Sequence, residues 1–213
     1  METYIKDNKI EGELIAFWDL CSDESPLNPM EDWDGFGKFV SFNSRHITFQ
    51  HPNDIEQDED MVLLSYFEHG NCLWGVKGTM NGMPDFRWDG TDTAGVWYPD
   101  DCLRKEADME GLKKGTPERA KRMEEFAAQA CETWTQYCNG EVYGYSVRIY
   151  KLLKLEDGSP VDAIGVYEDE SALFQDSCYG FFGREYAEQE MEGLVEDSLK
   201  KITPPDFSTE MDD

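Results

Sequence analysis

Positive charge is scarce in this sequence. Its 213 residues include 19 Lys and Arg against 46 Asp and Glu, which gives a formal net charge of −27 at pH 7. A protein that binds DNA, RNA or an anionic membrane needs a basic surface, and this balance argues against one. We therefore expect no direct nucleic-acid partner and no membrane partner.

Long apolar runs, histidines and catalytic motifs are also scarce. No run approaches the roughly 18 apolar residues of a membrane span. Only His46, His51 and His69 are available as the base that a Ser or Cys hydrolase requires. The short motifs of α/β-hydrolases, zinc proteases and nucleotide-binding loops do not occur. We therefore expect a non-enzymatic protein with no cofactor, no metal and no catalytic residues.

The six cysteines form no regular pattern. Their spacings are irregular, and the chain opens without the basic start and apolar run of a secretory leader. Cys131 and Cys138 lie seven residues apart on a predicted helix, roughly 10 Å along its axis, which is too far for a disulfide. We therefore expect free thiols in a reducing cytoplasm.

Short patterns that resemble metal sites are better interpreted as turns. His69 and Cys72 have the spacing of half a zinc site, but they fall where a hairpin turn is expected, and no second pair matches. The stretches DWDG (32–35) and DGTD (89–92) lack the later Gly and the twelfth-position Glu of a calcium-binding EF-hand. With 46 acidic residues, any chosen pair of carboxylates is uninformative.

Aromatic residues make up 13% of the chain and apolar residues 39%, which is too many for a disordered acidic protein. Period-two patterns and β-branched content predict extended segments throughout the chain. These segments are 9–20, 38–49, 61–67, 72–78, 94–98, 141–159, 163–169 and 176–183. The 61–67 and 72–78 segments have the spacing of a hairpin.

Helix signals are strongest in the middle of the chain. Thr116 as N-cap, Pro117 at the first helical position and Gly140 as the stop predict a long helix, and a short helix is expected near residues 99–101. A second helix is predicted at residues 183–202. The order of elements predicts an α+β fold, with an antiparallel sheet, a long central helix and an acidic C-terminal helix. We expect one domain over residues 1–203, any subdivision falling near residues 104–116, and a frayed acidic tail at 204–213.

Negative charge is concentrated at the two ends. Residues 1–60 hold 15 acidic and 4 basic residues, and residues 161–213 hold 15 and 3, whereas residues 104–160 hold 10 of each. A protein made acidic only to stay hydrated is expected to spread its carboxylates evenly. The neutral middle favours acidic faces of defined shape.

The predicted C-terminal helix carries a stripe of glutamates spaced three or four residues apart, Glu185, Glu188, Glu192 and Glu196. Like charges at these spacings repel by a few tenths of a kcal/mol per pair, so the stripe is tolerated at a cost. Carboxylates about 5 to 6 Å apart on a helix can occupy the basic groove that binds DNA phosphates. The alternative is an ordinary solvated face. The acidic N-terminal flank adds Asp32, Asp34, Glu56 and Asp58 as candidate partner-binding residues.

Three stretches resemble a family of uncharacterised bacteriophage and plasmid proteins: WDGFGKFVSFNSRH (33–46), YCNGEVYGYSV (137–147) and DSCYGFFG (176–183). That family is expected to show a W-D-N-L-G-like opening, a V-Y-G-[YF] strand and a D-S-C-W-G-F-[YF]-G strand. Here Gly35 and Phe36 stand in place of Asn and Leu, and Asn43 replaces an expected His. The resemblance implies a mobile-element protein and brings no catalytic residues with it.

These observations together predict a phage-encoded, non-enzymatic inhibitor in the host bacterial cytoplasm. It is expected to act as an acidic DNA mimic on the basic groove of a host nucleic-acid-binding protein or nuclease of the restriction or CRISPR type. The alternatives are a metal-dependent phage enzyme with clustered Asp and Glu, and an adaptor that binds a host protein through aromatic surface. The sequence leaves open the target, the oligomeric state and the acidic flank that binds.

Overall fold

The structure, a computed structural model, describes residues 3–167 and 170–202. The chain forms two compact units. Unit 1 consists of Met1–Pro26 and Glu141–Asp213, and unit 2 consists of Leu27–Gly140. Unit 2 is therefore inserted, in sequence, between the two parts of unit 1.

Unit 1 contains a four-stranded antiparallel sheet with the order β1-β2-β7-β8. Its strands are β1 (Thr3–Glu11), β2 (Leu14–Ser22), β7 (Val142–Lys151) and β8 (Phe174–Phe182). The central β2–β7 pair joins the two parts of the unit, because Leu14 lies opposite Lys151 and Ser22 lies opposite Tyr143. The sheet thus depends on a pairing between segments more than one hundred residues apart.

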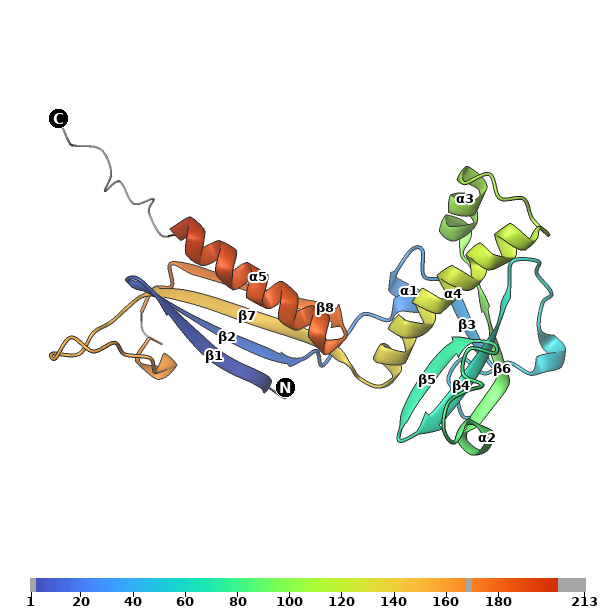
Figure 1. The fold of residues 1–213 in the computed structure, drawn as a ribbon, viewed down its shortest axis with the longest axis horizontal. Helices are drawn as coiled ribbons and strands as arrows, with labels where there is room; N and C mark the ends of the chain where they lie inside the picture. The colour runs from blue at the N-terminus through green and yellow to red at the C-terminus, as the bar shows by residue number, and fades with distance from the viewer. Residues whose placement is uncertain (1–2, 168–169, 203–213) are drawn as a thin grey trace. The chain divides into compact units, whose positions relative to one another are not determined.

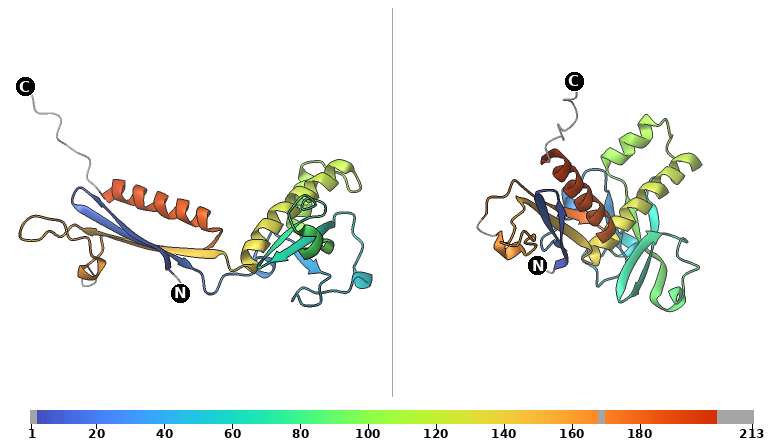
Figure 2. Two further views of the ribbon diagram at one scale, coloured as in Figure 1. Left: turned by 60° about the horizontal axis from the view of Figure 1, so that its bottom comes forward. Right: turned by 60° about the vertical axis from the view of Figure 1, so that its left-hand side comes forward.

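Helix α5 (Arg184–Ile202) runs along one face of this sheet, as Figures 1 and 2 show. The core beneath it combines alternate residues of β2 and β7 with one side of the helix. The opposite face is covered at one end by Tyr167, which follows the 3₁₀ turn η2 (Ile164–Val166) and packs on Ile15 and Phe17. The buried Tyr167 hydroxyl donates to the Val161 carbonyl at 2.7 Å and so keeps its polar group satisfied.

Unit 2 contains a second four-stranded antiparallel sheet with the order β3-β6-β4-β5 (Figure 1). Its strands are β3 (Lys38–Ser41), β4 (Val62–His69), β5 (Asn71–Val76) and β6 (Gly90–Tyr98). Helix α4 (Pro117–Cys138) packs on this sheet through Met123, Phe126, Ala127, Ala130 and Trp134. The smaller elements are α1 (Pro29–Asp32), η1 (Pro52–Asp54), α2 (Phe86–Asp89) and α3 (Asp101–Met109).

The Gly-Phe-Gly stretch before β3 is fixed by a tryptophan. The indole N–H of Trp97 donates to the Phe36 carbonyl at 2.9 Å. Gly37 has φ +79°, and a Cβ there would lie 2.4 Å from the Tyr98 carbonyl oxygen. Only glycine fits this position without a shift of the backbone.

The structure confirms the α+β class, the antiparallel pairing, the long central helix and the C-terminal helix. Helix α4 begins after Thr116, whose side chain caps the Arg119 N–H, and the chain turns at Gly140 with φ +69°. The predicted hairpin is β4–β5, closed by Gly70 at φ +86°.

Several predicted segments differ from the structure. Residues 9–20 form two strands rather than one, because Gly12 adopts φ +61° and reverses the chain. Extended structure after residue 38 ends at Ser41, and the predicted strand at 163–169 contains the turn η2 instead. The units divide at Pro26/Leu27 and Gly140/Glu141, whereas the expected subdivision near 104–116 falls inside unit 2. The predicted tail 204–213 lies outside the described residues.

Candidate functional site

The glutamate stripe lies on the solvent side and flank of α5 in unit 1. Glu185, Glu192 and Glu196 are exposed, and Glu188 is half-buried. The side of the helix that faces the sheet is closed by Ala187, Met191, Val195, Ser198 and Leu199. The helix is therefore amphipathic, and its apolar side fixes which carboxylates face water. Together these four residues, Glu185, Glu188, Glu192 and Glu196, form the acidic stripe.

Two members of the acidic stripe have a cation on the same helix. Arg184 Nε lies 2.6 Å from Glu188 Oε1, and Lys200 Nζ lies 3.6 Å from Glu196 Oε2. Within the described part of the chain, Glu185 and Glu192 make no ion pair. They are seven residues apart, about 10 Å along the axis. Along the stripe, the uncompensated carboxylates of Glu185 and Glu192 therefore alternate with the partly compensated ones of Glu188 and Glu196.

The four predicted residues of the N-terminal flank belong to unit 2 and have different environments. Asp34 and Glu56 are exposed, and the Asp32 carboxylate accepts the Asn28 N–H at 2.8 Å beside α1. Asp58 is held by Arg104, with Oδ2 2.7 Å from Nη2 and Oδ1 3.2 Å from Nη1. The predicted acidic residues are thus divided between the two units, and Asp58 is already paired inside unit 2.

Asp58 belongs to an ion-pair network that sequence reasoning missed. Arg119 and Asp60 are each 1% exposed and are joined by two hydrogen bonds, Nε–Oδ1 at 2.6 Å and Nη2–Oδ2 at 2.9 Å. Arg104 also reaches Asp60 Oδ2 at 2.9 Å. Hydrogen bonding from Arg119 holds the pKa of the Asp60 carboxyl below its usual value, against the opposing effect of burial. This network ties α3 and α4 to the loop before β4.

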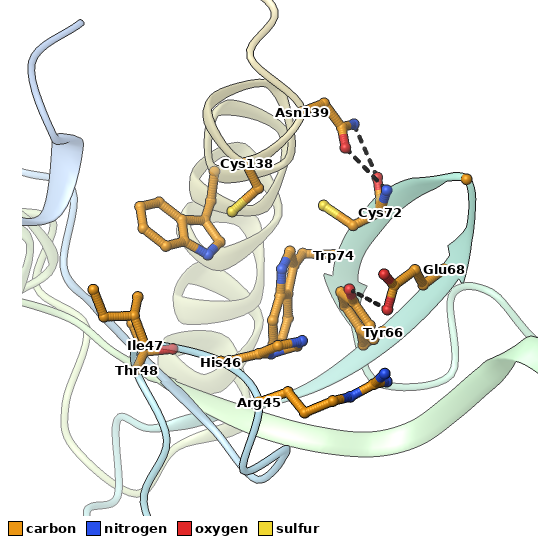
Figure 3. Close-up of a pocket in the computed structure, with 12 residues that line it drawn as sticks. Arg45, His46, Ile47, Thr48, Tyr66, Glu68, Cys72, Trp74, Cys138 and Asn139 are labelled. Carbon is orange, nitrogen blue, oxygen red and sulfur yellow. Dashed lines mark hydrogen bonds between the residues drawn. The ribbon is translucent and has the colours of Figure 1, made fainter. Parts of the chain in front are cut away.

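A pocket of about 380 Å³ opens on unit 2 between the loop after β3, the β4–β5 hairpin and the end of α4 (Figure 3). Its floor is aromatic. Tyr66 and Trp74 lie with ring centroids 4.7 Å apart, and Trp134 adds a third ring. Arg45 and Glu68 supply opposite charges to the lining. The pocket combines apolar rings with a few polar groups, as small-molecule sites do.

His46 is the titratable ring of this pocket. Its edge packs on Tyr66 and Trp74, with centroid distances of 4.8 and 5.6 Å. Nδ1 lies 2.8 Å from Ser41 Oγ and Nε2 lies 3.4 Å from Asn43 Nδ2, so both ring nitrogens are engaged. Burial lowers the pKa of His46, which keeps the ring neutral at pH 7. These contacts hold the His46 ring in place against Tyr66 and Trp74.

Cys72 and Cys138 face each other across one wall of the pocket (Figure 3). The side chain of Asn139, which follows Cys138, makes two hydrogen bonds with the Cys72 backbone. It accepts from the Cys72 N–H at 2.9 Å and donates to the Cys72 carbonyl at 3.0 Å. The end of α4 is thereby fixed to the start of β5. Spacing in the sequence gave no indication of this pair.

His69 and Cys72, which have the spacing of half a zinc site, each contact another residue. His69 Nδ1 lies 2.8 Å from Asp89 Oδ2, and this carboxylate raises the pKa of the imidazole. Cys72 faces Cys138 (Figure 3). Among residues 3–167 and 170–202, no group of three or more His, Cys, Asp or Glu is arranged to hold a metal ion.

The stretches that carry the family resemblance lie in both units. Residues 33–46 lead into β3 and on to the pocket, residues 137–147 cross the boundary at Gly140, and residues 176–183 form most of β8. Comparison of the chain with family models, curated proteins and solved structures finds no match. Within the described ranges, no helix has the length and apolar character that crossing a membrane requires.

Proposed function

We propose that this protein is a non-enzymatic, phage-encoded inhibitor that binds the basic nucleic-acid-binding groove of a host defence nuclease, of the restriction or CRISPR type. It acts in the host bacterial cytoplasm as an acidic mimic of DNA. The phage origin rests on the family resemblance, and the mode of binding rests on charge. The acidic stripe of α5 is the proposed contact surface.

The observation that carries the proposal is the outward position of the stripe on a helix whose other side is anchored. Met191 and Leu199 are 1% and 0% exposed, so α5 is held on the sheet and presents its carboxylates in a fixed row. Because the helix backbone is already ordered, binding costs little backbone conformational entropy, which favours association with a rigid, complementary groove. Complementary charge also steers association and raises its rate.

Net charge by unit supports the choice of α5. Residues 1–26 and 141–213 hold 25 acidic and 8 basic residues, a net charge of −17, against −10 for residues 27–140. The excess of negative charge is therefore greater in unit 1, which contains α5. A DNA duplex carries about one negative charge per 1.7 Å of axis, so the grooves of DNA-binding proteins are rich in positive charge. Such a groove would attract the carboxylates of the acidic stripe.

The proposal is tested by capture from a bacterial host lysate. The chain is immobilised, and bound proteins are recovered at low salt and again at about 0.5 M salt, where screening shortens to a few ångströms. We expect a nucleic-acid-binding protein that elutes at high salt and loses DNA binding when this chain is added. A partner that is indifferent to salt would contradict mimicry and favour the adaptor hypothesis, and inhibition abolished by EDTA would favour a metal-dependent enzyme.

A further inference from the structure

Two thiols of the unit 2 pocket form the most specific arrangement outside the acidic stripe. The Cys72 and Cys138 sulfur atoms point toward each other in Figure 3, one from the start of β5 and the other from the last residue of α4. We propose that these two residues form a reversible disulfide across one wall of the pocket. This is a covalent modification site, and it does not depend on the proposed inhibitor function.

The backbone around the pair is already held together. Asn139 brackets both the N–H and the carbonyl of Cys72, at 2.9 and 3.0 Å. Three residues before Cys138 on α4, Thr135 Oγ1 accepts the N–H of Trp74, which lies two residues after Cys72 on β5, at 2.9 Å. Because α4 and β5 are joined by three hydrogen bonds beside the thiols, the disulfide joins two segments whose backbones are already fixed to one another.

The other four cysteines lie elsewhere in the fold. Cys21 is buried in unit 1, where its thiol donates to the Gly144 carbonyl at 3.4 Å, and Cys178 lies on β8. Cys131 is buried on the core side of α4, and burial raises its pKa to about 12. Cys102 is exposed on α3. The pairing proposed here is therefore specific to Cys72 and Cys138.

The two facing thiols influence each other's ionisation. The neighbouring Cys72 thiol raises the pKa of Cys138. Oxidation begins when one of the two thiols loses its proton, because the thiolate is the reactive form. Since the remaining proton must also leave, the reaction is expected to become faster as pH rises.

The reaction with glutathione disulfide balances in two exchanges. The thiolate of one cysteine attacks one glutathione sulfur, forms a mixed disulfide and releases one glutathione thiolate. The other cysteine then loses its proton, attacks the protein sulfur of the mixed disulfide and releases the second glutathione. Two protein thiols are oxidised to one disulfide, and glutathione disulfide is reduced to two molecules of glutathione.

The bond would fix the pocket wall in one position. Trp74 and Trp134 belong to the same elements as the two thiols and line the same pocket. A disulfide that closes the long loop from residue 72 to residue 138 also restricts the unfolded chain. The oxidised protein is expected to melt at least about 5 °C higher than the reduced protein.

The test exposes the full chain to glutathione disulfide, alkylates the remaining thiols and maps the peptides by mass spectrometry. We expect a peptide that links Cys72 to Cys138, formed at least about tenfold faster in the native chain than in urea, where a long loop must close. Reduced glutathione should reverse it. Cys102→Ser is the matched control and should retain the link, whereas Cys138→Ser should accumulate glutathione on Cys72.

Asn139→Ala provides an independent check. The substitution removes the two hydrogen bonds between the Asn139 side chain and the Cys72 backbone, so it should slow closure of the disulfide while leaving both thiols in place. Glutathione attached separately to Cys72 and Cys138 without a linked peptide would overturn the proposal. A predominant link to another cysteine, or equal rates in the native and urea-unfolded chain, would also overturn it.

Discussion

Units 1 and 2 share one architecture and use charge in opposite ways. Each packs a helix on one face of a four-stranded antiparallel sheet, α5 on the sheet of unit 1 and α4 on that of unit 2. In unit 2, Arg104, Arg119 and Arg122 are all paired with carboxylates. In unit 1, Glu185 and Glu192 face water without an ion-pair partner in the described structure.

The difference separates charge that maintains a fold from charge available for binding. The Arg119–Asp60 pair is inaccessible to a partner, because each residue is 1% exposed. The carboxylates of the acidic stripe are accessible but repel one another. Variants that disturb each kind of charge should therefore have opposite effects on stability.

The largest effect is expected for Arg119→Met. The substitution leaves the Asp60 carboxylate buried with fewer donors, and loss of one partner of a buried pair destabilises by about 3 to 5 kcal/mol. Urea unfolding followed by tryptophan fluorescence measures this, because five of the six tryptophans lie in unit 2.

The control for this prediction is Arg122→Met, the same substitution three residues later on α4. Arg122 bonds Glu106, Glu110 and Glu125 at the surface, and exposed pairs contribute about 0 to 1 kcal/mol. Similar losses for the two variants would contradict the distinction between buried and exposed pairs.

In unit 1, the largest effect is expected for Met191→Ala. This substitution removes a buried apolar side chain from the contact between α5 and its sheet. Truncation of a buried methionine destabilises by about 2 to 5 kcal/mol. Hydrogen exchange of the α5 amides should become faster, while Gln189→Ala on the exposed side should leave it almost unchanged. Unchanged exchange in Met191→Ala would mean that this contact does not hold the helix.

Acid should weaken unit 2 through the carboxylates that are paired with arginines. The pKa values of Asp58 and Asp60 are lowered by hydrogen bonds from Arg104 and Arg119 respectively. Carboxyls with depressed pKa values contribute stability above their unfolded pKa of about 3.9, and that stability is lost as pH falls through the folded values. The urea concentration at the unfolding midpoint, measured from pH 6 to pH 2, should therefore decrease once the pH is below about 4. The decrease should be smaller in Arg119→Met. An equal decline in both proteins would contradict the assignment.

The smallest predicted effect has the opposite sign. Glu192 lies four residues from both Glu188 and Glu196, so Glu192→Gln removes two repulsive pairs and should raise the stability of unit 1 by about 0.5 kcal/mol. Glu190→Gln is the control, because no acidic residue lies three or four positions from Glu190. Thermal unfolding followed by circular dichroism compares them, and destabilisation by Glu192→Gln would contradict repulsion within the stripe.

Local signals in the sequence predicted the helices and the β4–β5 hairpin, because caps and turns act over a few residues. Thr116, Pro117 and Gly140 bound α4 in this way. The β1–β2 hairpin was not predicted, because the strand-like pattern continues on both sides of Gly12 and hides the turn that this residue makes. The division into two units was missed because it depends on the pairing of β2 with the distant β7.

The candidate sites show the same limit. The acidic stripe could be predicted because its four residues lie on one helix at a regular spacing. The Arg119–Asp60 pair and the facing thiols were not, because their members are 59 and 66 positions apart and meet only through the fold of unit 2. The sequence also gave no reason to separate the paired Asp58 from the exposed Glu56.

The most direct test of the central claim compares two double variants of α5 with equal charge change. Glu185→Lys with Glu192→Lys reverses the uncompensated carboxylates of the stripe, and Glu190→Lys with Asp197→Lys reverses two exposed carboxylates outside it. The measurement is the association rate with the captured nucleic-acid-binding protein at low salt. We expect the stripe variant to associate at least about tenfold more slowly than the control variant. Equal rates for the two variants would show that net charge, and not the row of glutamates on α5, determines binding.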